Sequence, residues 1–290
     1  MTQPLSRRRF LGASAASAAL GAAALASAAH ERVAAPPGGR LRQSVCRWTL
    51  PGALPEVCAR VRALGLAAID LLHVDEWSVA RQAGLTCSMG YASRREHFIE
   101  DGFNDPKNHP LLVAELTQAI PLAAAAGVPN VIAMFGNRRG LSDADGIENC
   151  ATGLRAVAPI AEQHGVTVCV ELLNSKIDHP DYQGDHTAFG VAVMQRIGSP
   201  RMKLLYDIYH MQIMEGDIIR TIREHGRWFG HFHTGGVPGR HDIDASQELN
   251  YRAVAAAIAD GGFQGYLAHE FTSKGEPYAG LAAACRICAV

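Results

Sequence analysis

Seven times along this chain, a helix-like segment ends at a glycine and a short apolar, strand-like run begins soon after it. Glycine is favoured at helix ends because it adopts the left-handed backbone conformation without steric cost. The regular alternation predicts helices and parallel strands in turn, which is the pattern of an α/β fold. The seven glycines are Gly65, Gly84, Gly127, Gly165, Gly198, Gly226 and Gly262.

The strands number eight when a first strand near residues 43–48 is added to the seven that follow the glycines. Eight strand–helix units over about 245 residues fit a closed (β/α)8 TIM barrel, so we predict a single catalytic domain over residues 43–290. An open doubly wound sheet is the alternative, but it needs a phosphate-binding glycine pattern after its first strand, and residues 48–52 (WTLPG) lack one. The other strands are expected at residues 67–72, 85–89, 131–135, 166–170, 202–206, 228–232 and 266–268.

The N-terminus carries three consecutive arginines, Arg7 to Arg9, before a stretch rich in Ala, Gly and Ser and a small-residue cleavage sequence at residues 26–28. This arrangement resembles a twin-arginine export signal over residues 1–28. The resemblance implies a periplasmic or otherwise exported protein that folds, and takes up any metal, before export. A basic start on an ordinary surface helix is the alternative. Residues 29–42 are expected to form a flexible lead-in.

Composition excludes several classes of protein. Apolar residues make up 48% of the chain and charged residues 19%, and no run of 18 strongly apolar residues follows the N-terminus, so we expect a soluble globule that is not a membrane protein. Residues 1–28 hold three Arg and no acidic residue, so their removal moves the net charge from −1 to −4. This sign disfavours a nucleic-acid partner. We expect a small-molecule substrate, and a homo-oligomer stays open.

The cysteines do not form a disulfide pattern. An odd number, seven, is scattered through apolar runs, which predicts that most are buried thiols. Cys285 and Cys288 have C-x-x-C spacing in a helical stretch without a second pair. We expect the two cysteines to lie on a helix face that packs against the rest of the domain. A redox or zinc-binding role is the alternative.

Four successive strands end at a potential metal ligand: Glu171, Asp207, His233 and Glu270. Their separations of 36, 26 and 37 residues each correspond to one strand–helix unit, so the ligands come from the fifth to eighth strands and converge as the barrel closes. The period of a strand places a second set of residues one layer below, where we expect them to fill the barrel. That set is Cys169, Leu205, His231 and Ala268.

Carboxylate oxygens with one imidazole favour one divalent ion, Mn²⁺, Mg²⁺ or Co²⁺, although Zn²⁺ is also compatible. A single acidic residue at a strand end is more often a helix N-cap or a solvated loop residue, so the prediction depends on the run of four. Of the two histidines on the seventh strand, we assign the ligand role to His233, because it lies nearer the strand end than His231.

Further candidates lie close to the strand ends. His210, three residues after Asp207, is a candidate acid–base group, with helix capping as the alternative. Arg240 and His241 lie in the long loop after the seventh strand and can hold a substrate carboxylate, or can be ordinary solvated residues. Two residues complete the predicted substrate-binding set: Asn174 and Trp48.

Four blocks of sequence resemble the hydroxypyruvate isomerase branch of the xylose isomerase-like TIM-barrel superfamily: residues 168–174 (VCVELLN), 206–212 (YDIYHMQ), 230–241 (GHFHTGGVPGRH) and 249–251 (LNY). The resemblance covers roughly residues 100–290. It implies that a divalent metal is held at Glu171, Asp207, His233 and Glu270, and that the two Glu residues also move the substrate proton. At the position of His233 some hydroxypyruvate isomerases carry Gln, whereas ketose epimerases carry His.

The predicted function is aldose–ketose isomerisation through an enediolate that the metal stabilises, with hydroxypyruvate converted to tartronate semialdehyde. Glu171 and Glu270 would move the proton, His210 would polarise an oxygen, and Arg240 would bind the substrate carboxylate. One alternative is a ketose 3-epimerase or keto-sugar lyase acting on a longer polyol. Others are an endonuclease IV-like phosphodiesterase, which needs more metal ligands and a basic face, and a non-catalytic exported sugar-binding protein.

Overall fold

The computed structural model describes residues 39–290 of the chain. The predicted export signal and all but the last residues of the predicted lead-in lie outside the described residues. The first strand begins at Arg42, the last residue assigned to the lead-in. None of the described helices is both long enough and apolar enough to cross a membrane.

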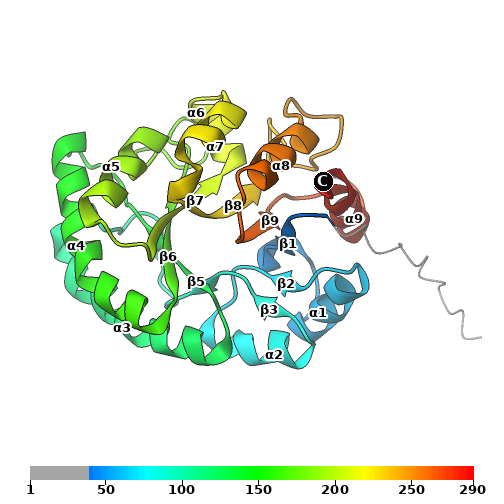
Figure 1. Cartoon of the computed structure of the whole chain (residues 1–290), viewed down its shortest axis with the longest axis horizontal. Coiled ribbons are helices and arrows are strands. Elements are labelled where there is room, and N and C mark those ends of the chain that lie inside the picture. Colours follow the sequence, from blue (N-terminus) through cyan, green and yellow to red (C-terminus); the bar gives the residue numbers. More distant parts are fainter. Residues whose placement is uncertain (1–38) are drawn as a thin grey trace, which may run out of the picture. The chain divides into compact units, whose positions relative to one another are not determined.

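A curled parallel sheet forms the centre of the fold (Figure 1). Seven strands pair in the order β1-β9-β8-β7-β6-β5-β4, and β2 pairs with β3. Isolated parallel bridges join Cys46 to Asp70 and Leu72 to Gly90, which connect the β2–β3 pair to both edges of the larger sheet. The strands are β1 (Arg42–Val45), β2 (Ala68–Ile69), β3 (Thr86–Cys87), β4 (Gly90–Tyr91), β5 (Asn130–Met134), β6 (Thr167–Leu172), β7 (Met202–Asp207), β8 (Phe229–Thr234) and β9 (Tyr266–His269).

These pairings confirm the predicted TIM barrel, with one difference in the third strand. The single strand expected at residues 85–89 is divided into β3 and β4. Together they fill the position between β2 and β5, since β3 pairs with β2 and β4 pairs with β5. The barrel therefore has eight strand positions, and β6 to β9 are the fifth to eighth of them.

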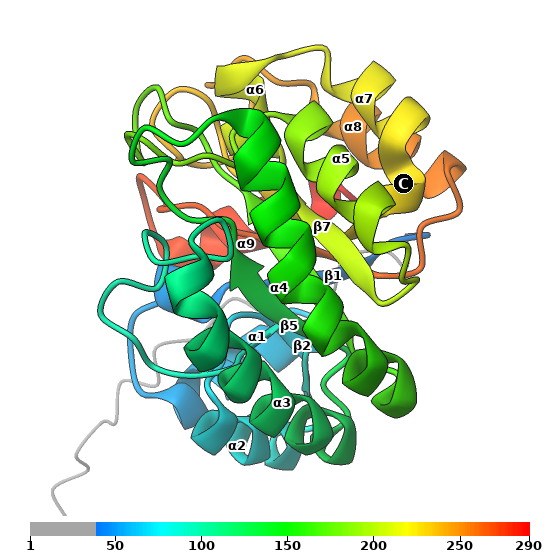
Figure 2. The same ribbon diagram turned by 90° about the vertical axis from the view of Figure 1, so that its left-hand side faces the viewer.

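Helices surround the sheet in chain order, as Figure 1 shows. The long helices α3 and α4 lie side by side on the outside of the barrel (Figure 2). On α3 the buried residues Leu112, Leu116 and Ile120 recur at helical spacing and face inward, which holds the helix on the sheet. The helices are α1 (Leu54–Ala63), α2 (Trp77–Gln82), α3 (His109–Ala126), α4 (Asp143–His164), α5 (Thr187–Ile197), α6 (Ile208–Met214), α7 (Ile218–His225), α8 (Tyr251–Asp260) and α9 (Pro277–Ile287).

The glycines that end the helices behave as predicted at six of seven positions, where φ lies between 69° and 85°. Gly226 is the exception: its φ is −52°, so the prediction of a left-handed conformation was wrong there. The chain does not turn at this glycine because the helix continues into a short 3₁₀ helix, Gly226–Trp228, before β8.

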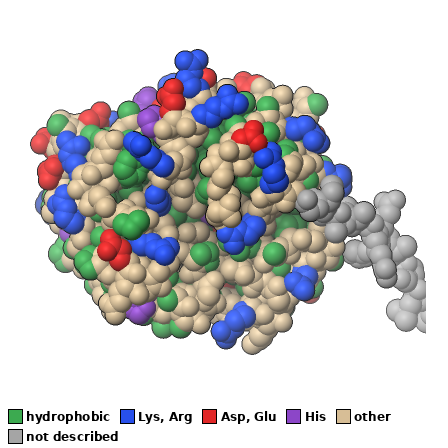
Figure 3. Space-filling model, in the orientation of Figure 1, with side chains coloured by type: hydrophobic (Ala, Val, Ile, Leu, Met, Phe, Trp, Pro, Cys, Tyr) green, Lys and Arg blue, Asp and Glu red, His purple; other side chains and the backbone are tan. Residues whose placement is uncertain are grey.

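The interior of the barrel is filled as the strand period predicted. The predicted barrel-filling side chains are fully buried, and Leu205 lies opposite His231 in the pairing of β7 with β8. All seven cysteines are buried free thiols, Cys285 on α9 and Cys288 at its end included. The face shown in Figure 3 carries separate Lys and Arg side chains with acidic, histidine and hydrophobic ones between them.

Candidate active site

Four ionisable side chains meet where β6 to β9 end. Glu171, Asp207, His233 and Glu270 are all buried, and one ligand atom from each lies within 4.8 Å of the others. His233 Nδ1 is central: it lies 3.5 Å from Glu171 Oε1, 4.0 Å from Asp207 Oδ2 and 2.6 Å from Glu270 Oε2. The structure thus brings together the four residues predicted as metal ligands, which we call the carboxylate cluster.

Asp207 is both a helix cap and a member of the carboxylate cluster. Its Oδ1 accepts hydrogen bonds from the backbone N–H groups of Tyr209 (2.8 Å) and His210 (3.3 Å), which begins α6. Its Oδ2 faces the cluster instead and accepts a hydrogen bond from Arg240 at 2.7 Å. Asp207 can therefore cap the helix and act as a metal ligand at the same time, because each role uses a different oxygen.

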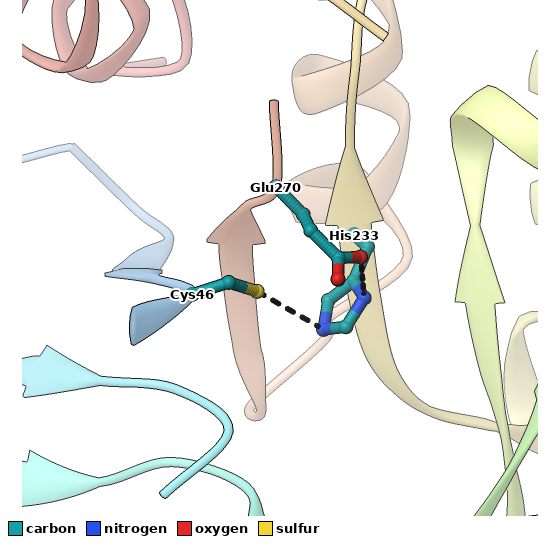
Figure 4. A group of neighbouring side chains, drawn as sticks. All are labelled: Cys46, His233 and Glu270. Atoms are coloured by element: carbon teal, nitrogen blue, oxygen red, sulfur yellow. Dashed lines mark hydrogen bonds and ion pairs between the residues drawn. The ribbon is translucent and has the colours of Figure 1, made fainter. Parts of the chain in front are cut away.

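His233 presents one nitrogen to the carboxylate cluster and the other to Asp70. Nε2 lies 2.9 Å from Asp70 Oδ2, whereas Nδ1 is buried and lies 2.6 Å from Glu270 Oε2. Figure 4 shows Glu270 on one side of the ring and Cys46 on the other. One imidazole nitrogen among three carboxylates is a donor set that fits a divalent metal ion.

Arg240 reaches into the cluster from the loop after β8. Its Nη2 donates to Asp207 Oδ2 at 2.7 Å and to Glu270 Oε2 at 2.5 Å, and its Nε donates to the Glu270 carbonyl at 3.2 Å. The guanidinium lies between the rings of Trp48 and Tyr209, 5.8 Å and 5.1 Å from their centroids. The residue predicted to bind a substrate carboxylate thus binds the protein's own carboxylates here.

Burial and charge perturb the groups of the site. Burial raises the pKa of Asp207 to about 7, against the opposing effect of Arg240. Burial also acts to raise the pKa of Glu270, but Arg240 and His233 outweigh it and hold that pKa well below its usual range. Burial and then the charge of Arg240 keep the pKa of His210 well below its usual value, so His210 is neutral. Opposite shifts in two neighbouring carboxyl groups are typical of acid–base sites.

The predicted His210 and Asn174 act as a pair. Asn174 Oδ1 accepts two backbone N–H groups, so its Nδ2 faces His210 Nδ1 at 2.6 Å and donates to it. A neutral imidazole whose Nδ1 accepts carries its proton on Nε2, which points toward Asp207 Oδ2 (3.6 Å) and Arg240 Nη1 (2.9 Å). Since two donors cannot share a hydrogen bond, His210 donates from Nε2 only when Arg240 Nη1 moves away.

Trp48 also joins the site, whereas His241 does not. Trp48 lies in a short 3₁₀ turn after β1, and its Nε1 donates to Glu270 Oε1 at 2.8 Å. The ring nitrogen Nδ1 of His241 lies 2.8 Å from the Thr272 carbonyl, and among the described residues no hydrogen bond joins the ring to the cluster. The structure therefore places only one of the two basic loop residues among the carboxylates.

A cavity of about 630 Å³ opens beside the carboxylate cluster, in the loops that follow the first three strands of the barrel. Trp48 and Tyr91 belong to its lining, together with Arg47, Leu71 and His73. Burial and then the nearby charge of Glu270 raise the pKa of the Tyr91 phenol, which places this wall close to the cluster. Trp48 links this wall to the cluster, because its Nε1 donates to Glu270.

The sequence profile of the xylose isomerase-like TIM barrel matches residues 59–287, most of the described chain. The chain belongs to this family. The chain is similar to the human protein named putative hydroxypyruvate isomerase, 32% identical over 253 residues, which span 81% of this chain and 90% of that protein. The 2-oxo-tetronate isomerase of Cupriavidus necator is 33% identical over 135 residues, which span 47% of this chain and 50% of that protein.

A solved structure has the same fold. The crystal structure of an AP endonuclease, family 2, from Brucella melitensis superposes with a TM-score of 0.72, covering 84% of this chain and 98% of that one at 24% identity. At this identity the superposition shows the shared barrel and nothing about the reaction.

Two residues of this xylose isomerase-like barrel escaped prediction from sequence. Asp70 directly follows β2 and Cys46 directly follows β1, and both are fully buried beside His233. Asp70 carries the same signal as the four predicted ligands, a polar residue at the carboxyl end of a strand. The strand before Asp70 is only two residues long, and Asp70 lies outside residues 100–290, which carry the family resemblance.

Proposed function

We propose that this chain is a metal-dependent isomerase that interconverts hydroxypyruvate and tartronate semialdehyde through an enediolate. The isomerase class is supported by relatives that are named isomerases and cover most of the chain. The observation that carries the proposal is the position of Glu171 and Glu270, two carboxylates within one ligand cluster, 3.5 Å and 2.6 Å from the same ring nitrogen of His233.

The metal ion would be held by the carboxylate cluster and, when bound, would supply Lewis-acid stabilisation of negative charge on the substrate oxygens. The four side chains are those of Glu171, Asp207, His233 and Glu270. Three carboxylates and one imidazole match the ligand preference of Mn²⁺, Mg²⁺ or Co²⁺, and of Zn²⁺ less closely.

The isomerisation moves a proton between neighbouring carbons, so it needs one base and one acid. Among the described residues no donor hydrogen-bonds to the Glu171 carboxylate, so we assign it to remove the proton from the hydroxymethyl carbon. Glu270, held by Trp48 and Arg240, takes up the proton of the hydroxyl group and delivers it to the former carbonyl carbon, while the proton on Glu171 passes to the former carbonyl oxygen. The reverse reaction exchanges the two roles.

His210 and Arg240 are assigned to the substrate oxygens. His210 Nε2–H, fixed by Asn174, polarises the carbonyl oxygen. Arg240 donates to Asp207 and Glu270, two of the residues that would hold the metal ion, so N–H groups of Arg240 would be released in the loaded site. The released N–H groups can then pair with a substrate carboxylate.

Replacing Arg240 with Met tests this assignment. Loss of one charge-assisted hydrogen bond typically costs about 1.5–3 kcal/mol, so we expect kcat/KM for hydroxypyruvate to fall by roughly 10- to 100-fold. Turnover of a neutral ketose is expected to fall much less, as measured by steady-state kinetics on both substrates. Arg240→Lys is the matched control, because it keeps the charge and loses the planar fork. Equal losses on both substrates would show that Arg240 only arranges the cluster.

A screen of the metal-reconstituted protein decides the proposed function. Hydroxypyruvate, free ketoses and 3-keto-sugars are each incubated with the protein and Mn²⁺ or Co²⁺, and proton NMR in D₂O follows the products. Formation of tartronate semialdehyde with incorporation of solvent deuterium supports the proposal. Binding without turnover of any compound would support the non-catalytic sugar-binding alternative.

A second candidate is a ketose 3-epimerase or keto-sugar lyase. It is supported by the D-psicose 3-epimerase of Agrobacterium fabrum, which is 34% identical over 109 residues, 34% of this chain and 37% of that protein. Turnover of a ketose or keto-sugar with no turnover of hydroxypyruvate in the same screen would place this candidate first.

We also propose that the chain is exported through its N-terminal twin-arginine sequence, Arg7 to Arg9 in the first 28 residues. The described chain enters the barrel at the amino end of β1, whereas the carboxylate cluster lies at the carboxyl ends of the strands. The fractionation of cells expressing the full chain, compared with an Arg8→Lys, Arg9→Lys variant, tests this proposal.

A further inference from the structure

Beneath the carboxylate cluster lies a buried carboxylate that the proposed reaction does not use. Asp70 is fully buried at the end of β2, and its Oδ2 lies 2.9 Å from His233 Nε2 and 3.2 Å from His231 Nε2. Cys46 Sγ lies 3.6 Å from the same oxygen. An ionised carboxylate with no access to water is costly to bury unless several donors compensate it, and the two imidazoles do so.

Asp70 is itself held in place from the other side. Its Oδ1 accepts a hydrogen bond from Ser88 Oγ at 2.5 Å, and Ser88 Oγ lies 2.6 Å from Ser44 Oγ. The backbone N–H of Asp70 donates to the Val45 carbonyl at 2.7 Å. Both serines are fully buried, so the carboxylate has one orientation.

This orientation selects the tautomer of His233. An ionised carboxylate only accepts hydrogen bonds, so His233 Nε2 must carry a proton to bond with Asp70. Nδ1 is the nitrogen that faces Glu171, Asp207 and Glu270, so it is the one left to bind a metal ion once its own proton is lost.

We propose that Asp70 is a positioning residue that holds His233 in the Nε2-protonated form and so sets the affinity of the carboxylate cluster for a divalent metal. The inference rests on the proposed metal-dependent function. Asp70 acts through His233 and touches neither metal nor substrate. Partners of this kind orient a ligating imidazole and make it a stronger donor, and their loss typically lowers metal affinity by 10- to 100-fold.

The test measures Co²⁺ affinity of the full chain by competition with a chelating dye, without turnover. Asp70→Ala removes the acceptor and is expected to lower the affinity by roughly 10- to 100-fold. Asp70→Asn keeps an oxygen of the same reach without the charge, and is expected to lose less. The matched control is Val61→Ala in α1, a buried position away from the cluster that lowers thermal stability and should leave Co²⁺ affinity unchanged.

A second readout reports the tautomer directly. Long-range ¹H–¹⁵N spectra of the protein loaded with diamagnetic Zn²⁺, with His233 assigned from its absence in His233→Gln, should show the proton on Nε2 in the wild type and in Asp70→Asn. If Asp70→Ala does not fold, Asp70→Asn supplies both measurements.

The possible results separate the two proposals. If the wild type binds Co²⁺ and the Asp70 variants bind it equally well, or lose affinity only as much as Val61→Ala does, Asp70 has no positioning role and the metal site stands. If wild-type His233 carries its proton on Nδ1 instead of Nε2, Asp70 likewise has no positioning role. If the wild type does not bind Co²⁺ at all, the proposed metal-dependent function fails, and this inference fails with it.

Discussion

Asp207→Ala is expected to abolish turnover and to lower metal content sharply. The substitution removes Oδ2, which faces His233 Nδ1 and pairs with Arg240, so the cluster loses one of three carboxylates. Arg240 then retains only Glu270 as a carboxylate partner in the cluster. Activity and bound metal per chain, measured after reconstitution with Mn²⁺ or Co²⁺ and removal of excess ion, check the prediction.

A matched variant separates this effect from loss of the helix cap. Asp207→Ala also removes the Oδ1 acceptor at the start of α6, which costs about 1 kcal/mol of stability. Asp207→Asn keeps an oxygen for the two backbone N–H groups but not the charge on the other atom, so it should unfold near the wild-type temperature and still be inactive. Full activity with unchanged metal content in both variants would remove Asp207 from the site.

The four members of the cluster could be predicted because each follows an apolar strand at one strand–helix spacing. In a closed parallel barrel the carboxyl ends of strands meet on one face, so residues such as Glu171 and Glu270, 99 positions apart in the chain, become neighbours without any knowledge of side-chain contacts. The choice between His231 and His233 followed from the same period. Both histidines contact Asp70, but only His233 also lies among the carboxylates of the cluster.

The hydrogen bonds between these groups could not be predicted, since they depend on the paths of loops. Arg240 has a positive φ of 54° in the loop after β8, and this turn directs its guanidinium into the cluster. Its neighbour His241 turns to the Thr272 carbonyl instead. No periodicity distinguishes two adjacent basic residues in a loop, so the sequence supported both equally.

Glu270→Gln is expected to lower kcat by roughly 10²- to 10⁴-fold, the usual contribution of a positioned acid or base. The amide keeps an oxygen that can accept the Trp48 Nε1 hydrogen bond, and the side chain keeps its length, so the fold should persist. It can neither take up nor deliver the substrate proton. Steady-state kinetics on hydroxypyruvate with metal content measured on the same sample check this prediction, because Glu270 is also a proposed ligand.

Exchange with solvent distinguishes loss of proton transfer from loss of metal. If Glu171 removes the proton and Glu270 returns one, metal-loaded Glu270→Gln should still exchange the hydroxymethyl protons of hydroxypyruvate with D₂O while forming little product, whereas Glu171→Gln should do neither. Proton NMR reads both events in one sample. Because the two carboxylates flank the same nitrogen of His233, a general defect in metal binding would suppress exchange in both variants alike. Near-wild-type turnover of Glu270→Gln would leave Glu171 as the sole proton carrier, and a single base acting on one face of the substrate would then replace the two-carboxylate mechanism.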